Sequence, residues 1–341
     1  MNGRERVFNI LEGKSVDRRP FGALLSLYGA KLTGCPLVRY YNDAVEYARG
    51  QDAIRQTISP DFLVGPFMLA GYGEAFGSSL RYLDTYVPNL LRPVISSADD
   101  IPRLTVPDID EHPRLLFFRD AIRQMKKSHG TEAVIVGIVL NPLDLPIVIM
   151  GLDAWLRAVL TDEDGTRRML DITTPFFVRY CNALFEDGAD VLATPLAFLT
   201  RDITTRSLVT DFALPVLRAA LSEIRGPMIS HHVGSTFFDY LDLLCDLPNV
   251  IGATMHVEDD IVGARSLVKP ETILFAGLDG PSLHTVPAAW IKAKCLEMLA
   301  LLQDDPRYIP FATGTDVDLR TPVDNLIAMR KAVEEFKKGQ P

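Results

Sequence analysis

PMISHHVG (227–234), VIGATMHVEDD (250–260), GARSLVKPETILFAGLDGP (263–281) and YIPFATGTDVDLRTPVDNLIAM (308–329) are four stretches of one kind in the last third of the sequence. Each contains a short apolar run that is followed by glycine or polar residues. Apolar runs without alternation predict strands that are buried on both faces, as in a parallel sheet. Polar residues that follow such strands gather at one end of the sheet. We therefore expect the chemistry of this chain at the C-terminal ends of these strands.

The rest of the chain repeats this alternation of strands and helices. Strands are predicted at 20–27, 61–68, 133–140, 190–195, 227–234, 250–257, 273–279 and 308–314. Helical periodicity separates them and predicts helices at 4–13, 42–59, 113–129, 151–160, 163–186, 205–225, 236–246, 260–267, 286–303 and 322–338. Eight parallel strands with helices between them predict an α/β fold, the (β/α)8 TIM-type barrel, with residues 1–341 as a single domain.

Three segments add detail to this prediction. The helix at 4–13 precedes the first strand and forms an N-terminal helical extension. Residues 28–34 are expected to form a glycine-bearing loop. The segment 70–110, after the second strand, is rich in Gly, Pro and Ser and forms a long excursion of the kind that commonly covers a site. A doubly wound open sheet is the alternative fold, but no GxGxxG motif follows a first strand.

Composition argues against several classes of protein. The chain has 35 Lys and Arg against 44 Asp and Glu, and a net charge of −9 disfavours nucleic acid as a partner. Its four cysteines are scattered without a CxxC pair, which disfavours a disulfide framework or a zinc knuckle. The N-terminus lacks the apolar segment of a signal peptide. Prolines interrupt the longest apolar stretch, 133–152, which we interpret as a strand followed by a loop. We expect a cytoplasmic protein without a membrane span, and a homo-oligomer is compatible with the sequence.

Several motifs make the sequence similar to one known family. They are GAKLTGCPLVRYYNDA (29–44), ISPDFLVGP (58–66), HHVG (231–234), DIVGARSLV with FAGLDGPSL (260–283), and TGTDVDLRTPVDNLIAM (313–329). The chain resembles the uroporphyrinogen decarboxylase superfamily nearly from end to end, and within it the branch of corrinoid-dependent methyltransferases. This resemblance implies a TIM-type barrel, in agreement with the strand count.

The decarboxylase activity of that superfamily fits this sequence poorly. The resemblance implies that arginines of an N-terminal Arg-Gln-Ala-Gly-Arg motif meet the carboxylates of the substrate, but the corresponding stretch reads LLSLYGAKLTG (24–34). A polyanionic porphyrinogen would then leave many charges unpaired. Asp61 stands where the catalytic aspartate of the family is expected, and it alone supports a decarboxylase of another carboxylated molecule.

The zinc site of the thiol-acting methyltransferases is incomplete here. The resemblance implies a His-x-Cys ligand pair after the fifth strand and a Cys after the eighth, which together hold a zinc that keeps a thiolate nucleophilic. His231 is retained, but Val233 and Thr315 stand where the two cysteines are expected. Zinc on His231 would need a site of a different type, and we expect no coenzyme M or homocysteine role.

The resemblance then favours a methyltransferase that takes a methyl group from a small non-thiol donor of the ether or amine type. The acceptor would be the cob(I)alamin of a separate corrinoid protein, because no DxHxxG cobalamin-binding motif occurs in the chain. An O- or N-linked methyl group leaves poorly, so such an enzyme needs a general acid or a Lewis acid. A decarboxylase and a non-catalytic ligand-binding barrel are the alternative functions.

Candidate site residues follow the predicted strands. The catalytic candidates are His231, His256, Asp316 and Asp61, the substrate-binding candidates are Tyr28, Phe67, His232 and Asp279, and Glu258, Lys31 and Glu74 are further polar residues near them. Adjacent residues of a strand point to opposite faces, so we expect only one of the two neighbouring histidines to face the barrel axis. Helix capping is the competing interpretation for Asp279 and Asp316. Asp61 precedes its strand, which conflicts with a place at the C-terminal end.

Overall fold

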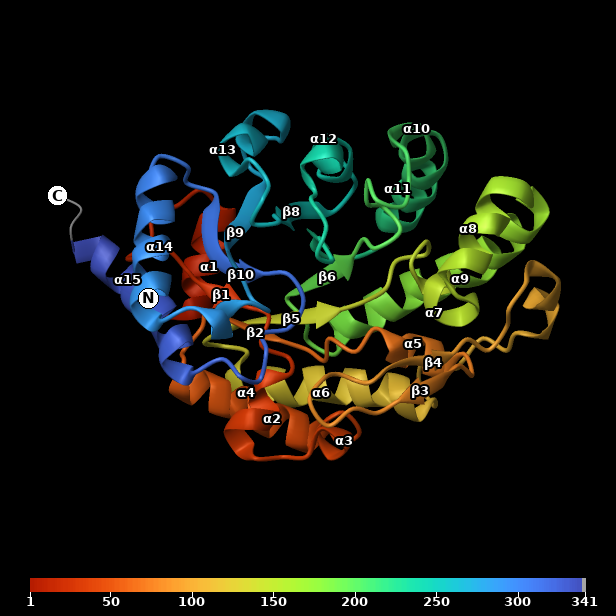
Figure 1. Cartoon of the computed structure of the whole chain (residues 1–341), viewed down its shortest axis with the longest axis horizontal. Coiled ribbons are helices and arrows are strands. Elements are labelled where there is room, and N and C mark those ends of the chain that lie inside the picture. The colour runs from red at the N-terminus through yellow and green to blue at the C-terminus, as the bar shows by residue number, and fades with distance from the viewer. Residues whose placement is uncertain (339–341) are drawn as a thin grey trace.

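The computed structural model describes residues 1–338, which form a nearly closed barrel of eight parallel strands with helices outside (Figure 1). The strands are β1 (Gly22–Ala23), β2 (Phe62–Val64), β5 (Val134–Ile138), β6 (Val191–Pro195), β7 (Met228–His231), β8 (Val250–Thr254), β9 (Ile273–Asp279) and β10 (Tyr308–Thr313). Their order is β1-β10-β9-β8-β7-β6-β5-β2. The Asp61 N–H donates to the Phe21 carbonyl at 3.0 Å and links the two end strands. The predicted (β/α)8 barrel is confirmed.

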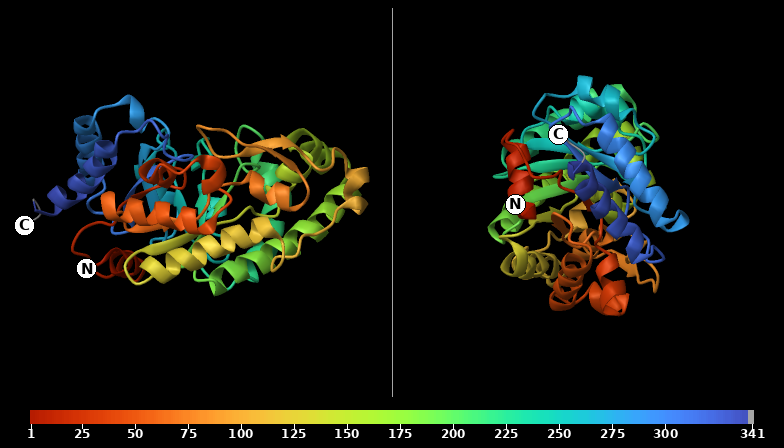
Figure 2. Two further views of the ribbon diagram at one scale, coloured as in Figure 1. Left: turned by 90° about the horizontal axis from the view of Figure 1, so that it is seen from below. Right: turned by 90° about the vertical axis from the view of Figure 1, so that its left-hand side faces the viewer.

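The helices that cover the barrel follow the predicted periodicity. The longer ones are α1 (Gly3–Leu11), α4 (Ala44–Thr57), α6 (Pro113–His129), α8 (Leu152–Thr161), α9 (Glu163–Glu186), α11 (Leu214–Ser222), α14 (Ala288–Leu301) and α15 (Val323–Lys338). Aspartates begin two of them: Asp43 accepts N–H bonds from the first turn of α4, and Asp162 accepts one from Gly165 of α9. Helices α6 and α9 lie side by side along the barrel (Figure 2).

The helical layer is thin after β7 and β8, where the sequence predicted helices at 236–246 and 260–267. The structure has a 3-10 turn and α12 (Leu241–Leu244) after β7, and α13 (Ile261–Ala264) with a 3-10 turn after β8. The predicted helix at 205–225 is also interrupted: a π turn separates α10 (Arg206–Leu208) from α11. Pro215 lies in the first turn of α11 and has no N–H for a regular helical bond, which explains the interruption.

Two predicted loops contain helices. Residues 28–34 form α2 (Tyr28–Thr33), closed by Gly34 in the left-handed conformation, and α3 (Leu37–Tyr40) follows. Gly29 permits this packing, because a Cβ there would lie 2.8 Å from the backbone of Gly50 in α4. The stretch after β5 forms α7 (Leu145–Met150), in which Pro146 lies in the first turn, where its missing N–H costs little.

The excursion after β2 has structure of its own. It contains α5 (Ala70–Ala75), an antiparallel hairpin of β3 (Ser79–Arg81) and β4 (Asn89–Arg92), and a 3-10 turn at Ala98–Arg103. Tyr86 and Val87, in the turn of the hairpin, pack against the buried core. The excursion is therefore a folded cover and not an open loop.

The barrel interior is filled by side chains from alternate strand positions. Phe62, Phe275 and Phe311 meet edge to face, with ring centroids 5.7–5.9 Å apart. Val7 and Ile10 of α1 belong to the same cluster, so the predicted N-terminal helical extension closes one end of the barrel. Within residues 1–338 no helix has the length and apolarity needed to cross a membrane.

Candidate active site

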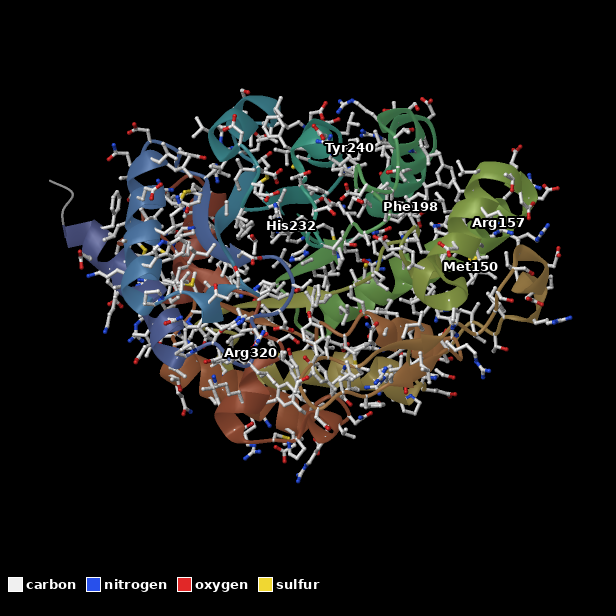
Figure 3. All side chains as sticks on the ribbon, viewed as in Figure 1. Met150, Arg157, Phe198, His232, Tyr240 and Arg320 are labelled. Carbon is white, nitrogen blue, oxygen red and sulfur yellow. The ribbon has the colours of Figure 1, made fainter. Side chains whose placement is uncertain are left out.

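Three histidines meet at the C-terminal ends of β7 and β8. His231 is the last residue of β7, and its ring lies 5.5 Å from that of His232, with the planes 5° apart. The ring of His256, just after β8, contacts the His232 ring edge to face at 5.3 Å. Figure 3 shows His232 in the middle of the molecule. The two rings stack, although strand alternation predicted opposite orientations; β7 ends at His231, so the alternation need not extend to His232.

His231 is the histidine with unused nitrogens. Its ring is buried and packs against Phe67 at 5.6 Å, and neither ring nitrogen has a hydrogen-bond partner within the described residues. Burial lowers its pKa to about 4. At neutral pH it is a neutral imidazole that offers one N–H donor and one lone pair to a ligand.

His232 has a different role. The Gly234 N–H points to its Nδ1 at 3.2 Å and the Gly314 N–H to its Nε2 at 3.1 Å. Burial, together with the neighbouring His231 and His256, lowers its pKa to about 3. Two backbone donors directed at the two ring nitrogens oppose protonation, so His232 does not supply a proton at neutral pH. It instead links the end of β7 to the end of β10.

Asp316 is the acid of this site. It follows β10 and is buried, and its Oδ1 accepts the Leu27 N–H at 2.8 Å. In the described part of the chain its Oδ2 has no hydrogen-bond partner. Burial raises its pKa well above the usual range of a carboxyl group, although backbone N–H groups oppose this. Burial therefore favours the protonated form of Asp316.

Contacts connect Asp316 to the histidines. Leu27, which donates to Asp316, follows Ser26, and the Ser26 hydroxyl accepts the Phe67 N–H at 2.8 Å. The Tyr41 hydroxyl lies 3.3 Å from the same Ser26 oxygen. Because the Phe67 ring contacts His231, these residues form one continuous site at the C-terminal end of the barrel. Phe67 lies where the sequence predicted a substrate contact.

Tyr41, Ser26 and Tyr86 are site residues that the sequence analysis missed. Burial raises the pKa of Tyr86, the nearby carboxylates of Asp316 and Asp318 raise it further, and a hydrogen bond with Thr315 lowers it. Tyr86 thus brings the hairpin of the long excursion to the segment after β10. The length of that excursion was the only sequence signal for this contact.

Other predicted residues have local partners. The Tyr28 hydroxyl and the Lys31 ammonium both donate to the Thr321 carbonyl, and burial raises the pKa of Tyr28 to about 12. Asp279 accepts bonds from the Ser282 N–H at 3.2 Å and the Ser282 hydroxyl at 2.5 Å, so it stabilises the turn after β9. Glu258 is exposed, and Glu74 forms an ion pair with Arg114 at 2.5 Å.

Asp61 lies apart from this group, at the N-terminal end of β2 and hence at the opposite end of the barrel. Its carboxylate pairs with Arg6 at 3.1 Å and Arg18 at 2.8 Å, and it accepts the Phe21 N–H at 2.9 Å. The interpretation of Asp61 as catalytic is therefore not retained. These contacts hold α1 and β1 to the start of β2, a structural role.

The residues present do not fit the zinc site of the thiol-acting methyltransferases. Among residues 1–338, no three His, Cys, Asp or Glu side chains are grouped closely enough to hold a metal ion. His231 supplies one suitable nitrogen, but Val233 and Thr315 occupy the positions expected for cysteines. The four cysteines are buried at other places in the fold. We therefore derive no catalytic step through zinc.

Comparison with known proteins agrees with this architecture. The sequence profile of the family described as uroporphyrinogen decarboxylase (URO-D) matches residues 2–336. The chain belongs to this family. The similarity to the family's corrinoid-dependent methyltransferase branch, expected from the motifs, is confirmed by the relatives that follow.

Relatives of both chemistries occur within the family. Methylcobamide:CoM methyltransferase MtbA of Methanosarcina acetivorans is 25% identical over 283 residues, which cover 81% of this chain and 82% of that protein. Uroporphyrinogen decarboxylase of Coxiella burnetii is 27% identical over 279 residues, 77% of this chain and 74% of that enzyme. A solved structure, a methyltransferase from Methanosarcina mazei, matches with a TM-score of 0.86 and 21% identity over 98% of this chain and 99% of that one, which shows the shared fold.

Proposed function

We propose that this protein is a methyltransferase component that moves a methyl group between a small non-thiol donor and a separate corrinoid protein. The donor carries its methyl group on oxygen or nitrogen, as in an ether or an amine. The relatives named as methylcobamide methyltransferases support the methyl-transfer chemistry. The site supports the non-thiol donor, because its residues do not gather the ligands that would activate a thiol as a zinc thiolate.

The position and surroundings of Asp316 carry this proposal. An alkoxide or amide is a poor leaving group, and its departure requires that a proton reach the heteroatom. Asp316 is buried, keeps one carboxyl oxygen without a partner in the described structure, and has a pKa that burial raises, which favours the protonated form. His231 and His232 cannot take this role, because burial lowers the pKa of both and keeps them neutral at pH 7. Asp316 is thus the residue suited to general-acid catalysis.

The corrinoid of the partner protein would supply, as cob(I)alamin, a strong nucleophile that accepts the methyl group. The bond between the methyl carbon and the heteroatom would break with its electron pair left on the heteroatom. The proton of Asp316 passes to that heteroatom, and water later restores it to the carboxylate. His231 contributes one N–H donor that can hold the heteroatom while Phe67 provides an apolar contact for the methyl group.

The decarboxylase alternative loses its support, because Asp61 lies at the other end of the barrel in ion pairs. A buried carboxyl group with one oxygen unpartnered in the described residues costs stability, and this cost favours a functional role for Asp316 over the non-catalytic alternative.

The test is methylation of cob(I)alamin by candidate ethers and methylamines, followed by its absorption spectrum. Asp316→Asn keeps the shape of the side chain and removes the transferable proton, so we expect a loss of rate of about 100-fold or more. Asp318→Asn is the matched control: Asp318 lies two residues away, and Arg320 lowers its pKa to about 2, so it holds no proton to donate. Its rate should stay within about twofold of the wild type, as for a surface ion pair.

Two results would contradict the proposal. One is an unchanged rate in Asp316→Asn. The other is methyl transfer to or from thiols alone, which would restore the thiol role that the missing cysteines argue against. Metal analysis of the protein purified without a tag and without chelator should accompany these assays. If the protein contains one zinc per chain and His231→Ala loses it, then a Lewis acid, and not Asp316, activates the leaving group.

A further inference from the structure

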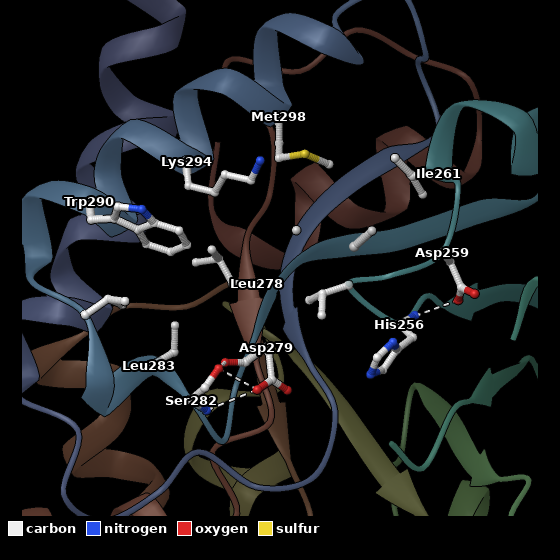
Figure 4. Close-up of a pocket in the computed structure, with 14 residues that line it drawn as sticks. His256, Asp259, Ile261, Leu278, Asp279, Ser282, Leu283, Trp290, Lys294 and Met298 are labelled. Atoms are coloured by element: carbon white, nitrogen blue, oxygen red, sulfur yellow. Dashed lines mark hydrogen bonds between the residues drawn. The ribbon is translucent and has the colours of Figure 1, made fainter. Parts of the chain in front are cut away.

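A pocket of about 320 Å³ lies between β9 and α14, beside the barrel mouth (Figure 4). Its wall is formed largely by apolar side chains: Leu278 from β9, Leu283 from the following turn, and Trp290 and Met298 from α14. The helical layer is thin here, where α13 and a 3-10 turn follow β8. Trp290 is 48% exposed, so a ligand in the pocket can reach its ring.

The inner end of this pocket reaches the candidate active site. His256, just after β8, and Asp279, the last residue of β9, both line it. The ring of His256 contacts His232, which in turn stacks against His231. A ligand in the pocket could therefore contact His256 and would be separated from His231 by His256 and His232. The pocket's size and apolar wall are typical of a small-molecule site.

The charged side chains that line the pocket differ in how strongly other groups of the protein bind them. Asp259 accepts N–H bonds from Phe237, Phe238 and His256, and Asp279 accepts bonds from the N–H and hydroxyl of Ser282. These two carboxylates are thus held by the backbone turns around them. They do not require a cation from a ligand.

Lys294, in contrast, has only a weak partner within the protein. Its side chain is 34% exposed and points into the pocket in Figure 4. Its partner is Glu297, three residues along the same helix, at 2.7 Å, and the Glu297 side chain is 62% exposed. An exposed pair of this kind is weak, so a carboxylate delivered by a ligand can replace Glu297. The ammonium would then bind one end of a ligand whose body lies on the apolar wall.

We propose that this pocket binds a small, largely apolar carboxylate, with its carboxylate on Lys294 and its body against Leu278, Leu283 and Trp290. This binding site does not depend on the proposed function.

The binding test uses the whole chain and three probes of similar size: benzoate, benzyl alcohol and benzyltrimethylammonium. The chain has two tryptophans, and since Trp155 is fully buried in α8, a change in fluorescence on binding is expected to come from Trp290. We expect benzoate to bind more tightly than the other two probes. Trp290→Phe should remove the fluorescence signal, and calorimetry should still detect binding.

Two variants of α14 test the role of Lys294. Lys294→Met keeps the apolar stem, and we expect it to weaken benzoate binding by about tenfold or more, as for a lost charge-assisted hydrogen bond. Binding of benzyl alcohol should change by less than about twofold, because the apolar wall is intact. Glu297→Gln removes the competing carboxylate and should tighten benzoate about twofold to threefold. Thermal unfolding of each variant checks that the fold is retained.

Absence of benzoate binding would overturn the proposal, and so would a preference for the cation or an unchanged affinity in Lys294→Met. If no donor methylates cobalamin while binding still depends on Lys294, the proposed function fails and the pocket's carboxylate specificity stands.

Discussion

Asp61 and Asp316 are carboxylates at opposite ends of the barrel, 0% and 1% exposed respectively. Asp61 has two arginines and a backbone N–H as partners. Asp316 has a backbone N–H on one oxygen and, in the described structure, no partner on the other. Burial is the same for both, so burial does not distinguish the structural residue from the catalytic candidate. The partners do, because a buried charge needs compensation and a buried acid without it keeps its proton.

The largest expected effect of a single change is on stability at the Asp61 end. Asp61→Ala leaves Arg6 and Arg18 without their shared carboxylate and should lower the free energy of unfolding by about 3–5 kcal/mol. Denaturant unfolding measures this. In contrast, Asp316→Asn should leave the unfolding free energy nearly unchanged or raise it. Equal destabilisation by the two changes would contradict the comparison.

Asp144 is a third buried carboxyl group, and its hydrogen-bond partners are intermediate between those of Asp61 and Asp316. It is buried and has three neutral donors, the N–H groups of Ala197 and Phe198 and the side-chain amide of Asn141. Burial outweighs these donors and raises its pKa to about 7, from the usual 3.8. Neutral donors thus compensate only part of the cost of burying the Asp144 charge.

This shift predicts a pH dependence of stability. Between about pH 4 and pH 7 the folded chain holds the Asp144 proton and the unfolded chain does not, so stability should fall as the pH rises through this range. The total is at most about 4 kcal/mol, at 1.36 kcal/mol per pKa unit. Because the histidines of the site contribute the opposite slope, the measurement is the difference between wild type and Asp144→Asn at each pH. A difference that does not vary with pH would show that Asp144 is ionised throughout.

A smaller loss of stability is expected when the hydrogen bond between the ends of β7 and β10 is removed. His232→Ala leaves the Gly314 N–H without its ring acceptor in a buried place and should cost about 1–3 kcal/mol. Calorimetric unfolding checks the loss. His232→Asn, which keeps a polar side chain at this position, should recover part of it. A loss above that range would indicate that the histidine stack contributes more than this hydrogen bond.

The sequence predicted the fold better than the site. Eight apolar runs and their spacing were sufficient for the barrel, because strands that are buried on both faces are visible in one dimension. Asp61 was a candidate through the family resemblance, although its position before the strand already conflicted with a catalytic place. Its ion pairs with Arg6 and Arg18 at the N-terminal end of β2 indicate a structural role.

The arrangement of the candidate site depends on contacts between distant residues. The bond from the Gly314 N–H to His232 spans 82 residues, and the bond from Leu27 to Asp316 spans 289. Motifs predicted that His231, His232 and Asp316 follow strands, but not that the two histidines stack or that Asp316 lacks a second partner. Such properties follow from packing, which a single sequence does not contain.

The helix α1 seals one end of the barrel, since Val7 and Ile10 fill the space among the strand side chains there. Reactants must then arrive and depart on the same side. If a corrinoid protein covers that side during methyl transfer, the donor has to be in place before the two proteins meet. The demethylated product then stays bound until the two proteins dissociate. We therefore expect turnover to follow an obligatory order of arrival, with dissociation of the protein complex as the slow step.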